Sequence, residues 1–236
     1  KPWILQKSNG YYHQCRDKAI YIQPHELLVG GVGFKPRAGV LCADSSASII
    51  EKELDTISTR PYDPFYLSEE GKKVFTEDVQ DYWKNKCVLD RWRLLAPKDM
   101  ETLRNNGIIF IDRKAVRGYG ENTPGWERIL HKGLGTIRQE AKDALAKLDD
   151  AVPGDLEKMY FYQATIQAAD GIILLANRHA DLAEKMAEKC QDPIRKAELL
   201  KIAEVNRWVP EHPARNFYEA CQSMLSYEYA IFMEQN

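Results

Sequence analysis

The sequence lacks the features that would place it on a membrane or on a nucleic acid. No apolar run approaches the ~20 residues that span a bilayer, and no signal peptide is recognisable. The net charge is −2, so the chain offers neither a basic surface for nucleic acid nor an electrostatic attraction to anionic lipid. We therefore expect neither a membrane nor a nucleic acid among its partners.

Cysteines are few and scattered. The five are Cys15, Cys42, Cys87, Cys190 and Cys221, and they form neither a metal-ligand pair nor a disulfide framework. An odd number of thiols suits a reducing compartment, so we predict a cytoplasmic protein with inert thiols and no metal in this chain.

The composition is typical of a globular domain, with 44% hydrophobic and 29% charged residues. There is no internal repeat, low-complexity tract or flexible linker, so residues 1–236 are expected to form a single unit. Helix caps and proline breaks predict a mainly α fold with a few short strands, the best strand candidate being 107–111. The predicted helices span residues 1–20, 44–57, 68–83, 90–95, 100–105, 124–148, 153–190, 193–207 and 214–234.

The segment 208–222 predicts a rigid extended entry followed by the last helix. Pro210 and Pro213 fix φ, and Pro213 suits a first helical turn, where its missing N–H is no loss. Within this helix, Phe217 and Leu225 are eight residues apart and are expected on one buried face, with Cys221 between them.

The longest predicted helix carries the candidate binding site. An aspartate stands among the apolar and small side chains of one helical face, where its charge is costly unless paired. No basic residue of this helix lies on that face. Polar groups converging beside an apolar stripe are typical of a small-molecule pocket, but the residues alone favour a structural or edge-exposed aspartate. The face comprises Tyr162, Ile166, Ala169, Asp170 and Ile173, flanked by Gln163 and Gln167. His179, further along, is expected at the surface.

Four segments of the chain resemble glycyl radical enzymes, the family of pyruvate formate-lyase, diol dehydratases and choline trimethylamine-lyase. Residues 208–222 match its P-x-H-P-A-R-x-F-x-E-A-x-Q pattern. Residues 53–65 match E-L-D-T-x-x-x-R-x-x-D-P-F. Residues 26–31 resemble E-L-I-V-G, with leucine for isoleucine, and 124–134 resemble P-x-Y-x-x-V-L-x-x-G-L, with tryptophan for tyrosine and isoleucine for valine. The matches follow the family's order and span nearly the whole chain.

Two family motifs are missing. No cysteine is followed two residues later by glutamate, and no Arg-Val-x-Gly-Tyr loop is present. Residues 116–119 (Val-Arg-Gly-Tyr) imitate that loop, but they come too early and lack the Arg-Val order. By resemblance, the chain is the N-terminal, mainly helical part of an enzyme with a ten-stranded α/β barrel. It would hold no catalytic residue and would be inactive alone.

The resemblance also implies cofactor and partners. A glycyl radical would stand on a glycine outside this chain, installed by a separate S-adenosylmethionine iron–sulfur activase. The remainder of the polypeptide, a small-molecule substrate and a second copy in a homodimer complete the expected partners. Such lyases belong to anaerobic metabolism, in the cytoplasm or inside a bacterial microcompartment.

The resemblance assigns Tyr162, Gln163, Gln167 and Asp170 to the wall of the substrate chamber. Choline lyases pair Tyr with Asp eight residues later, as Tyr162 and Asp170 stand here, whereas sulfonate lyases and arylacetate decarboxylases place Arg nearer Gln163. A carboxylate beside an aromatic ring suits a quaternary ammonium group. We expect C–N cleavage of a cationic substrate such as choline. The alternatives are a decarboxylase, a diol dehydratase, a sulfonate lyase, or a non-catalytic helical binding module derived from the family.

Overall fold

The structure, a computed structural model, describes residues 2–31, 33–34, 41, 43–110 and 124–234. These residues fall into two compact units, Lys1–Gly31 with Thr123–Glu234 and Val32–Asn122 with Gln235–Asn236, which we describe separately. This division does not test whether residues 1–236 belong to one larger domain, which stays a prediction. The described residues form helices and no β-strand.

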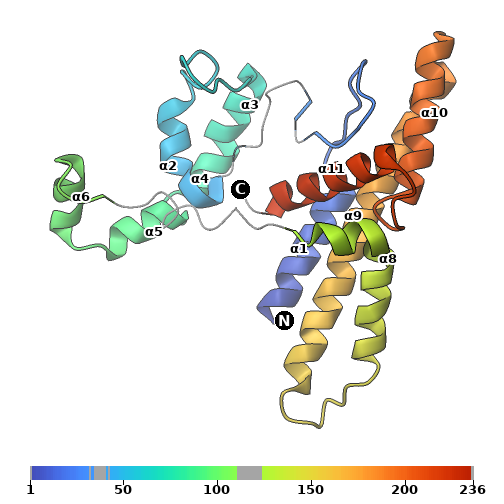
Figure 1. The fold of residues 1–236 in the computed structure, drawn as a ribbon. Coiled ribbons are helices and arrows are strands. Elements are labelled where there is room, and N and C mark those ends of the chain that lie inside the picture. Colours follow the sequence, from blue (N-terminus) through green and yellow to red (C-terminus); the bar gives the residue numbers. More distant parts are fainter. Residues whose placement is uncertain (1, 32, 35–40, 42, 111–123, 235–236) are drawn as a thin grey trace. The chain divides into compact units, whose positions relative to one another are not determined.

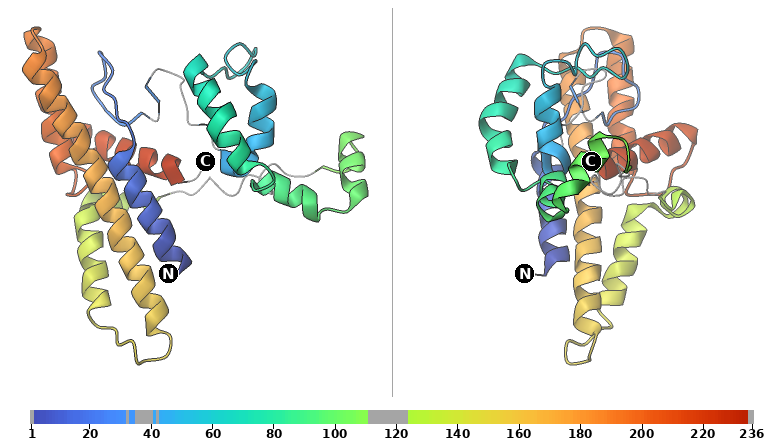
Figure 2. Two further views of the ribbon diagram at one scale, coloured as in Figure 1. Left: turned by 180° about the vertical axis from the view of Figure 1, so that it is seen from behind. Right: turned by 90° about the vertical axis from the view of Figure 1, so that its left-hand side faces the viewer.

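The first unit is built around one long helix, α9. Figures 1 and 2 show α9 running between α1 and α8, with α10 packed along its other end. These helices are α1 (Trp3–Asp17), α8 (Trp126–Leu145), α9 (Asp155–Lys189), α10 (Pro193–Trp208) and α11 (Phe217–Glu234). The helix predicted over 153–190 is observed as the 35-residue α9 and is the centre of the unit.

Small residues let the neighbours approach α9 closely. A Cβ added to Gly171 would meet the Cα of Tyr12 and the Sγ of Cys15, each at 3.4 Å, so α1 packs directly on the α9 backbone. Toward the other end, fully buried alanines such as Ala180 and Ala183 pack against Leu199 of α10. Close packing of this kind fixes the rotation of α9, and with it the direction in which its polar residues point.

The second unit is a smaller cluster of short helices. Its buried core contains Phe75, Cys87 and Leu89, packed against α2 residues Ala43 and Ala47. The helices are α2 (Ala43–Glu53), α3 (Glu69–Val74), the π-helix η1 (Phe75–Val79), α4 (Gln80–Trp83), α5 (Val88–Leu95) and α6 (Lys98–Asn105). None of the helices described in either unit has the length and apolar composition needed to cross a membrane.

Two predicted helix starts are confirmed by their caps. The Ser68 hydroxyl accepts from the N–H of Gly71 at 3.0 Å, and helical structure continues to Trp83 as predicted. The Asp192 carboxylate accepts from the N–H of Ile194 at 2.9 Å before α10. Both side chains satisfy backbone donors that the first turn leaves free.

The strand prediction for 107–111 is wrong over its described residues. Gly107 has a φ of +70° and forms a turn after α6, where the N–H groups of Ile108 and Ile109 donate back to the Leu103 carbonyl. Phe110 is 95% exposed. A β-branched run without a neighbouring strand has no ladder partner, so the local helix-ending hydrogen bonds prevail.

The start of the last helix was also predicted wrongly. Helix α11 begins at Phe217 and not near Pro213, because the Asn216 side chain caps it by accepting from the N–H of Glu219 at 3.0 Å. Phe217 is 85% exposed, while Cys221 and Leu225 are half-buried. The expected buried face is therefore wrong at Phe217.

Candidate functional site

The predicted site residues occupy one side of α9 in different environments. Ala169 and Ile173 are buried as expected, and Tyr162 is half-buried. Gln163 is exposed, and the Asp170 side chain is 42% exposed. Asp170 therefore stands at the edge of the apolar stripe, where its carboxylate can meet a ligand without complete desolvation.

Gln167 is engaged in helix packing. Its Oε1 accepts from the Ser8 hydroxyl at 2.9 Å, and its Nε2 donates to the Asn9 Oδ1 at 3.1 Å. Both polar ends of the amide are thus committed to α1. These bonds fix the orientation of the amide, and they leave one Nε2 hydrogen and one Oε1 lone pair for a substrate.

Asp170 has a basic partner that the sequence analysis did not identify. Arg138 of α8 donates from Nη1 to Asp170 Oδ1 at 2.9 Å and from Nη2 to Glu211 Oε1 at 2.6 Å. Burial alone would lower the pKa of the Arg138 guanidinium, but the two carboxylate hydrogen bonds raise it above its ordinary value. The charge of Asp170, which has no basic partner on its own helix, is therefore paired from α8 and does not require a bound cation.

The segment after α10 positions Glu211 against a kink in α8. Gly133, predicted to be helical, has φ +74° and ψ 162°. A Cβ there would overlap the Glu211 carbonyl oxygen and lie 2.6 Å from the carbonyl carbon of His212. The N–H groups of Leu134 and Gly135 donate to the carbonyls of Pro210 and Glu211 at 2.9 and 2.8 Å. Glycine is required by both the positive φ and the close approach.

The same segment is stiffened by its own side chains. Arg215 donates to the Glu219 carboxylate from Nη2 at 2.6 Å and lies over the Trp208 ring, 4.5 Å from its centroid. Hydrogen bonding from Arg215 holds the pKa of the buried Glu219 carboxyl below its ordinary value, outweighing the effect of burial. The Trp208 Nε1 donates to the Pro213 carbonyl at 2.7 Å. These contacts give the 208–222 pattern a structural role.

The other quoted segments are also joined by specific contacts. In the first unit, Gln222 of α11 exchanges two hydrogen bonds with the Val29 backbone, at 2.9 and 2.8 Å. In the second, Arg60 donates to Glu53 at 2.9 Å and to the Asp63 carbonyl at 2.8 Å, and it lies over the Phe65 ring. Residues that are separated in the sequence of these patterns are therefore in contact in the structure.

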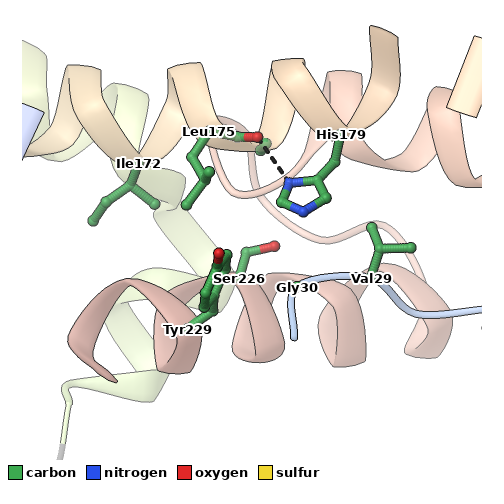
Figure 3. A pocket seen from close by; sticks show the side chains of 8 residues that line it. Val29, Gly30, Ile172, Leu175, His179, Ser226 and Tyr229 are labelled. Atoms are coloured by element: carbon green, nitrogen blue, oxygen red, sulfur yellow. Dashed lines mark hydrogen bonds between the residues drawn. The ribbon is translucent and has the colours of Figure 1, made fainter. Parts of the chain in front are cut away.

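A small cavity lies between α9 and α11 (Figure 3). Its volume is about 10 Å³, room for about one water molecule and far less than a metabolite needs. His179, expected at the surface, is buried in its wall and donates from Nδ1 to the Leu175 carbonyl at 2.9 Å. Burial lowers its pKa, so the ring is neutral. The cavity is therefore not the substrate site.

Some sequence-based interpretations lie outside the described residues, among them the loop-like residues 116–119. Within the described part of the chain, no group of three or more His, Cys, Asp or Glu side chains is placed to hold a metal ion.

Comparison with known proteins decides the family. The family model described as "Pyruvate formate lyase-like" matches residues 1–236. The chain belongs to the pyruvate formate lyase-like family. Its relatives are glycyl radical enzymes, as the four quoted segments predicted.

Three relatives show how much of their length corresponds to this chain. The isethionate sulfite-lyase of Oleidesulfovibrio alaskensis is 33% identical, over 94% of this chain and 28% of its own length. The B12-independent glycerol dehydratase structure from Clostridium butyricum superposes with a TM-score of 0.88 at 29% identity, over 100% of this chain and 30% of that one. A glycyl radical enzyme structure from Archaeoglobus fulgidus gives 0.83 at 28% identity, over 98% and 29%. The chain thus spans less than a third of the length of these relatives.

Arg138 and Glu211 are the site residues that sequence reasoning missed. One signal was available. Arg138 falls between Leu134 and Ala141 on the buried stripe of α8, where a basic residue needs an acidic partner as much as Asp170 does. Complementary charges on two apolar stripes predict that the two helices pair there.

Proposed function

We propose that this chain forms one wall of the substrate chamber in a glycyl radical lyase or dehydratase. The substrate would be a small alcohol without negative charge, preferably choline and otherwise a vicinal diol. Tyr162, Gln163, Gln167 and Asp170 would face it. Within this family member, the half-exposed carboxylate of Asp170 is the observation that supports the proposal most directly.

The charges around Asp170 favour this substrate class over an anion. The cluster joins two carboxylates, Asp170 and Glu211, to one guanidinium, that of Arg138. At neutral pH its formal charge is one unit negative. Two N–H groups of Arg138 already donate to carboxylates, and the net negative charge of the cluster would repel a sulfonate or carboxylate substrate. An alcohol could donate to Asp170, and a cation would also relieve the excess charge.

The ring of Tyr162 favours a substrate that carries a cationic group. It is half-buried, with its ring edge-on to that of Phe161 at 5.6 Å between centroids. Eight residues separate it from Asp170, about 12 Å along the helix axis. A small cation could meet both the ring and the carboxylate only if the two side chains extend toward each other along this side of α9.

The radical chemistry would come from outside these 236 residues. A glycyl radical, installed by an S-adenosylmethionine iron–sulfur activase, would supply the hydrogen abstraction that starts bond cleavage. The residues of this chain would bind and orient the alcohol and keep water away. We expect the complete enzyme to contain the ten-stranded barrel and to form a homodimer. Residues 1–236 alone should give no glycyl radical signal by electron paramagnetic resonance.

A sulfonate lyase is the second candidate. The supporting observation is the 33% identity to an isethionate sulfite-lyase across 94% of this chain. Against it stands Gln163, an amide near the position where the sulfonate lyases carry arginine. A sulfonate lyase would need a cation from another part of the enzyme.

The test compares Asp170→Asn with wild type in the complete, activated enzyme, using choline, propane-1,2-diol, an arylacetate and isethionate. Unit charges ~4–5 Å apart interact by a few kcal/mol at an effective dielectric near 20, so kcat/KM should fall about a hundredfold. Asp181→Asn is the matched control, because Asp181 lies on the same helix as Asp170 and pairs with a different arginine, Arg207 of α10. Equal turnover of choline by the two variants would refute the role of Asp170. An enzyme that turns over isethionate and none of the other three substrates would establish the sulfonate lyase.

A further inference from the structure

We infer that Glu211 sets the charge preference of the substrate chamber through Arg138, without touching the substrate. The inference rests on the proposed function, in which Asp170 faces the chamber. Glu211 would then determine specificity because it competes with Asp170 for the single positive charge of Arg138.

Glu211 is held firmly enough for this role. Its backbone carbonyl accepts from the N–H of Gly135, three residues before Arg138 in α8. A Cβ on Gly135 would lie 3.1 Å from the Glu211 Cγ, so the missing side chain makes room for the glutamate stem. The carboxylate then ends 2.6 Å from Arg138 Nη2. Both the backbone and the side chain of Glu211 are therefore fixed to one turn of α8.

The charge count explains the effect. One guanidinium serves two carboxylates, so Asp170 keeps part of its negative charge uncompensated. Replacing Glu211 by an uncharged residue would leave one guanidinium for one carboxylate and a neutral cluster. The next basic residue of α8, Lys142, is exposed and makes no ion pair with the described residues, so it does not belong to the cluster. Glu211 is thus the source of the excess charge.

The experiment measures competitive inhibition of the complete enzyme by two probes of similar size and opposite charge, tetramethylammonium and methanesulfonate. Glu211→Gln keeps the shape and removes the charge. The inhibition constant of tetramethylammonium should rise about tenfold and that of methanesulfonate should fall, as expected for a unit charge ~8–10 Å away. Glu140→Gln is the matched control, because Glu140 pairs with Lys132 at 2.9 Å, apart from the cluster. It should change neither constant.

A second variant reverses the sign. Arg138→Gln makes the cluster two units negative, so tetramethylammonium should bind more tightly and methanesulfonate more weakly. General structural damage would weaken both probes together, and that outcome overturns the inference, as does a Glu211→Gln enzyme that behaves like Glu140→Gln. Asp170→Asn separates the two levels of the argument. If Asp170→Asn shifts the two inhibition constants and Glu211→Gln does not, the inference about Glu211 fails and the proposed function stands. If Asp170→Asn shifts neither constant, the proposed function fails with it.

Discussion

The side-chain amide of Gln222 pairs with the backbone of Val29 across 193 residues of sequence, donating from Nε2 to its carbonyl and accepting from its N–H. Both groups are buried. This pair fixes the 26–31 segment to α11 in the way a strand neighbour would. It also gives the glutamine that ends one family pattern a structural role.

Replacing Gln222 by Leu should destabilise the protein strongly. The change leaves the buried N–H and carbonyl of Val29 without partners, at about 1–3 kcal/mol for each group. Gln139→Leu is the control, since among the described residues Gln139 bonds only to Asp143, on an exposed helix face. Thermal unfolding of the complete enzyme measures the difference. Equal melting temperatures for the two variants would mean that Val29 finds other partners.

Two glycine substitutions should have opposite effects. Gly133→Ala places a Cβ onto the Glu211 carbonyl at a positive φ, so it should destabilise the unit and displace Glu211. Gly10→Ala lies in the exposed middle of α1 with nothing within 4 Å of its Cβ, and should stabilise by about 0.5–1 kcal/mol. Differential scanning calorimetry checks both. A harmless Gly133→Ala would contradict the described kink.

Two buried tyrosines provide a second matched pair. The Tyr229 hydroxyl has no hydrogen-bond partner among the described residues, whereas that of Tyr11 donates to the Ala230 carbonyl at 3.2 Å. Tyr229→Phe should therefore be neutral or stabilising, and Tyr11→Phe should cost about 1 kcal/mol. Urea unfolding distinguishes them. A loss above about 1 kcal/mol for Tyr229→Phe would show that a water in the cavity of Figure 3 bonds this hydroxyl.

The Arg215–Glu219 pair predicts a pH dependence. The folded-state pKa of Glu219 lies below its ordinary value of 4.5, so its contribution to stability is complete above pH 4.5. That contribution is lost as the pH falls through the folded-state pKa, because the unfolded chain takes up the proton first. Glu219→Gln should therefore be less stable than wild type at pH 7, with a smaller deficit at pH 4. A constant deficit would show that the carboxylate charge contributes nothing.

Local signals predicted most of the helical boundaries. Ser68 and Asp192 cap helices because their side chains bond to nearby N–H groups, and such contacts lie within three residues in sequence. The proline at 213 misled because it was assigned to a first turn, although Asn216 offers a better cap. The four family segments predicted the family itself.

Long-range contacts could not be predicted in the same way. Arg138 meets Asp170 across 32 residues and Glu211 across 73, so nothing local to Asp170 reveals its partner. The kink at Gly133 depends on a backbone that arrives from after α10. In each case a residue on another element decides the outcome, and sequence patterns of period 3.6 describe only one element at a time.

A structure of the complete enzyme with its alcohol substrate bound tests the central claim most directly. The account predicts a substrate hydroxyl within hydrogen-bond distance of Asp170, about 2.5–3.0 Å between oxygens, with Arg138 still bridging Asp170 and Glu211. A substrate held by Arg138 through an anionic group, or one bound out of reach of Asp170, would contradict it.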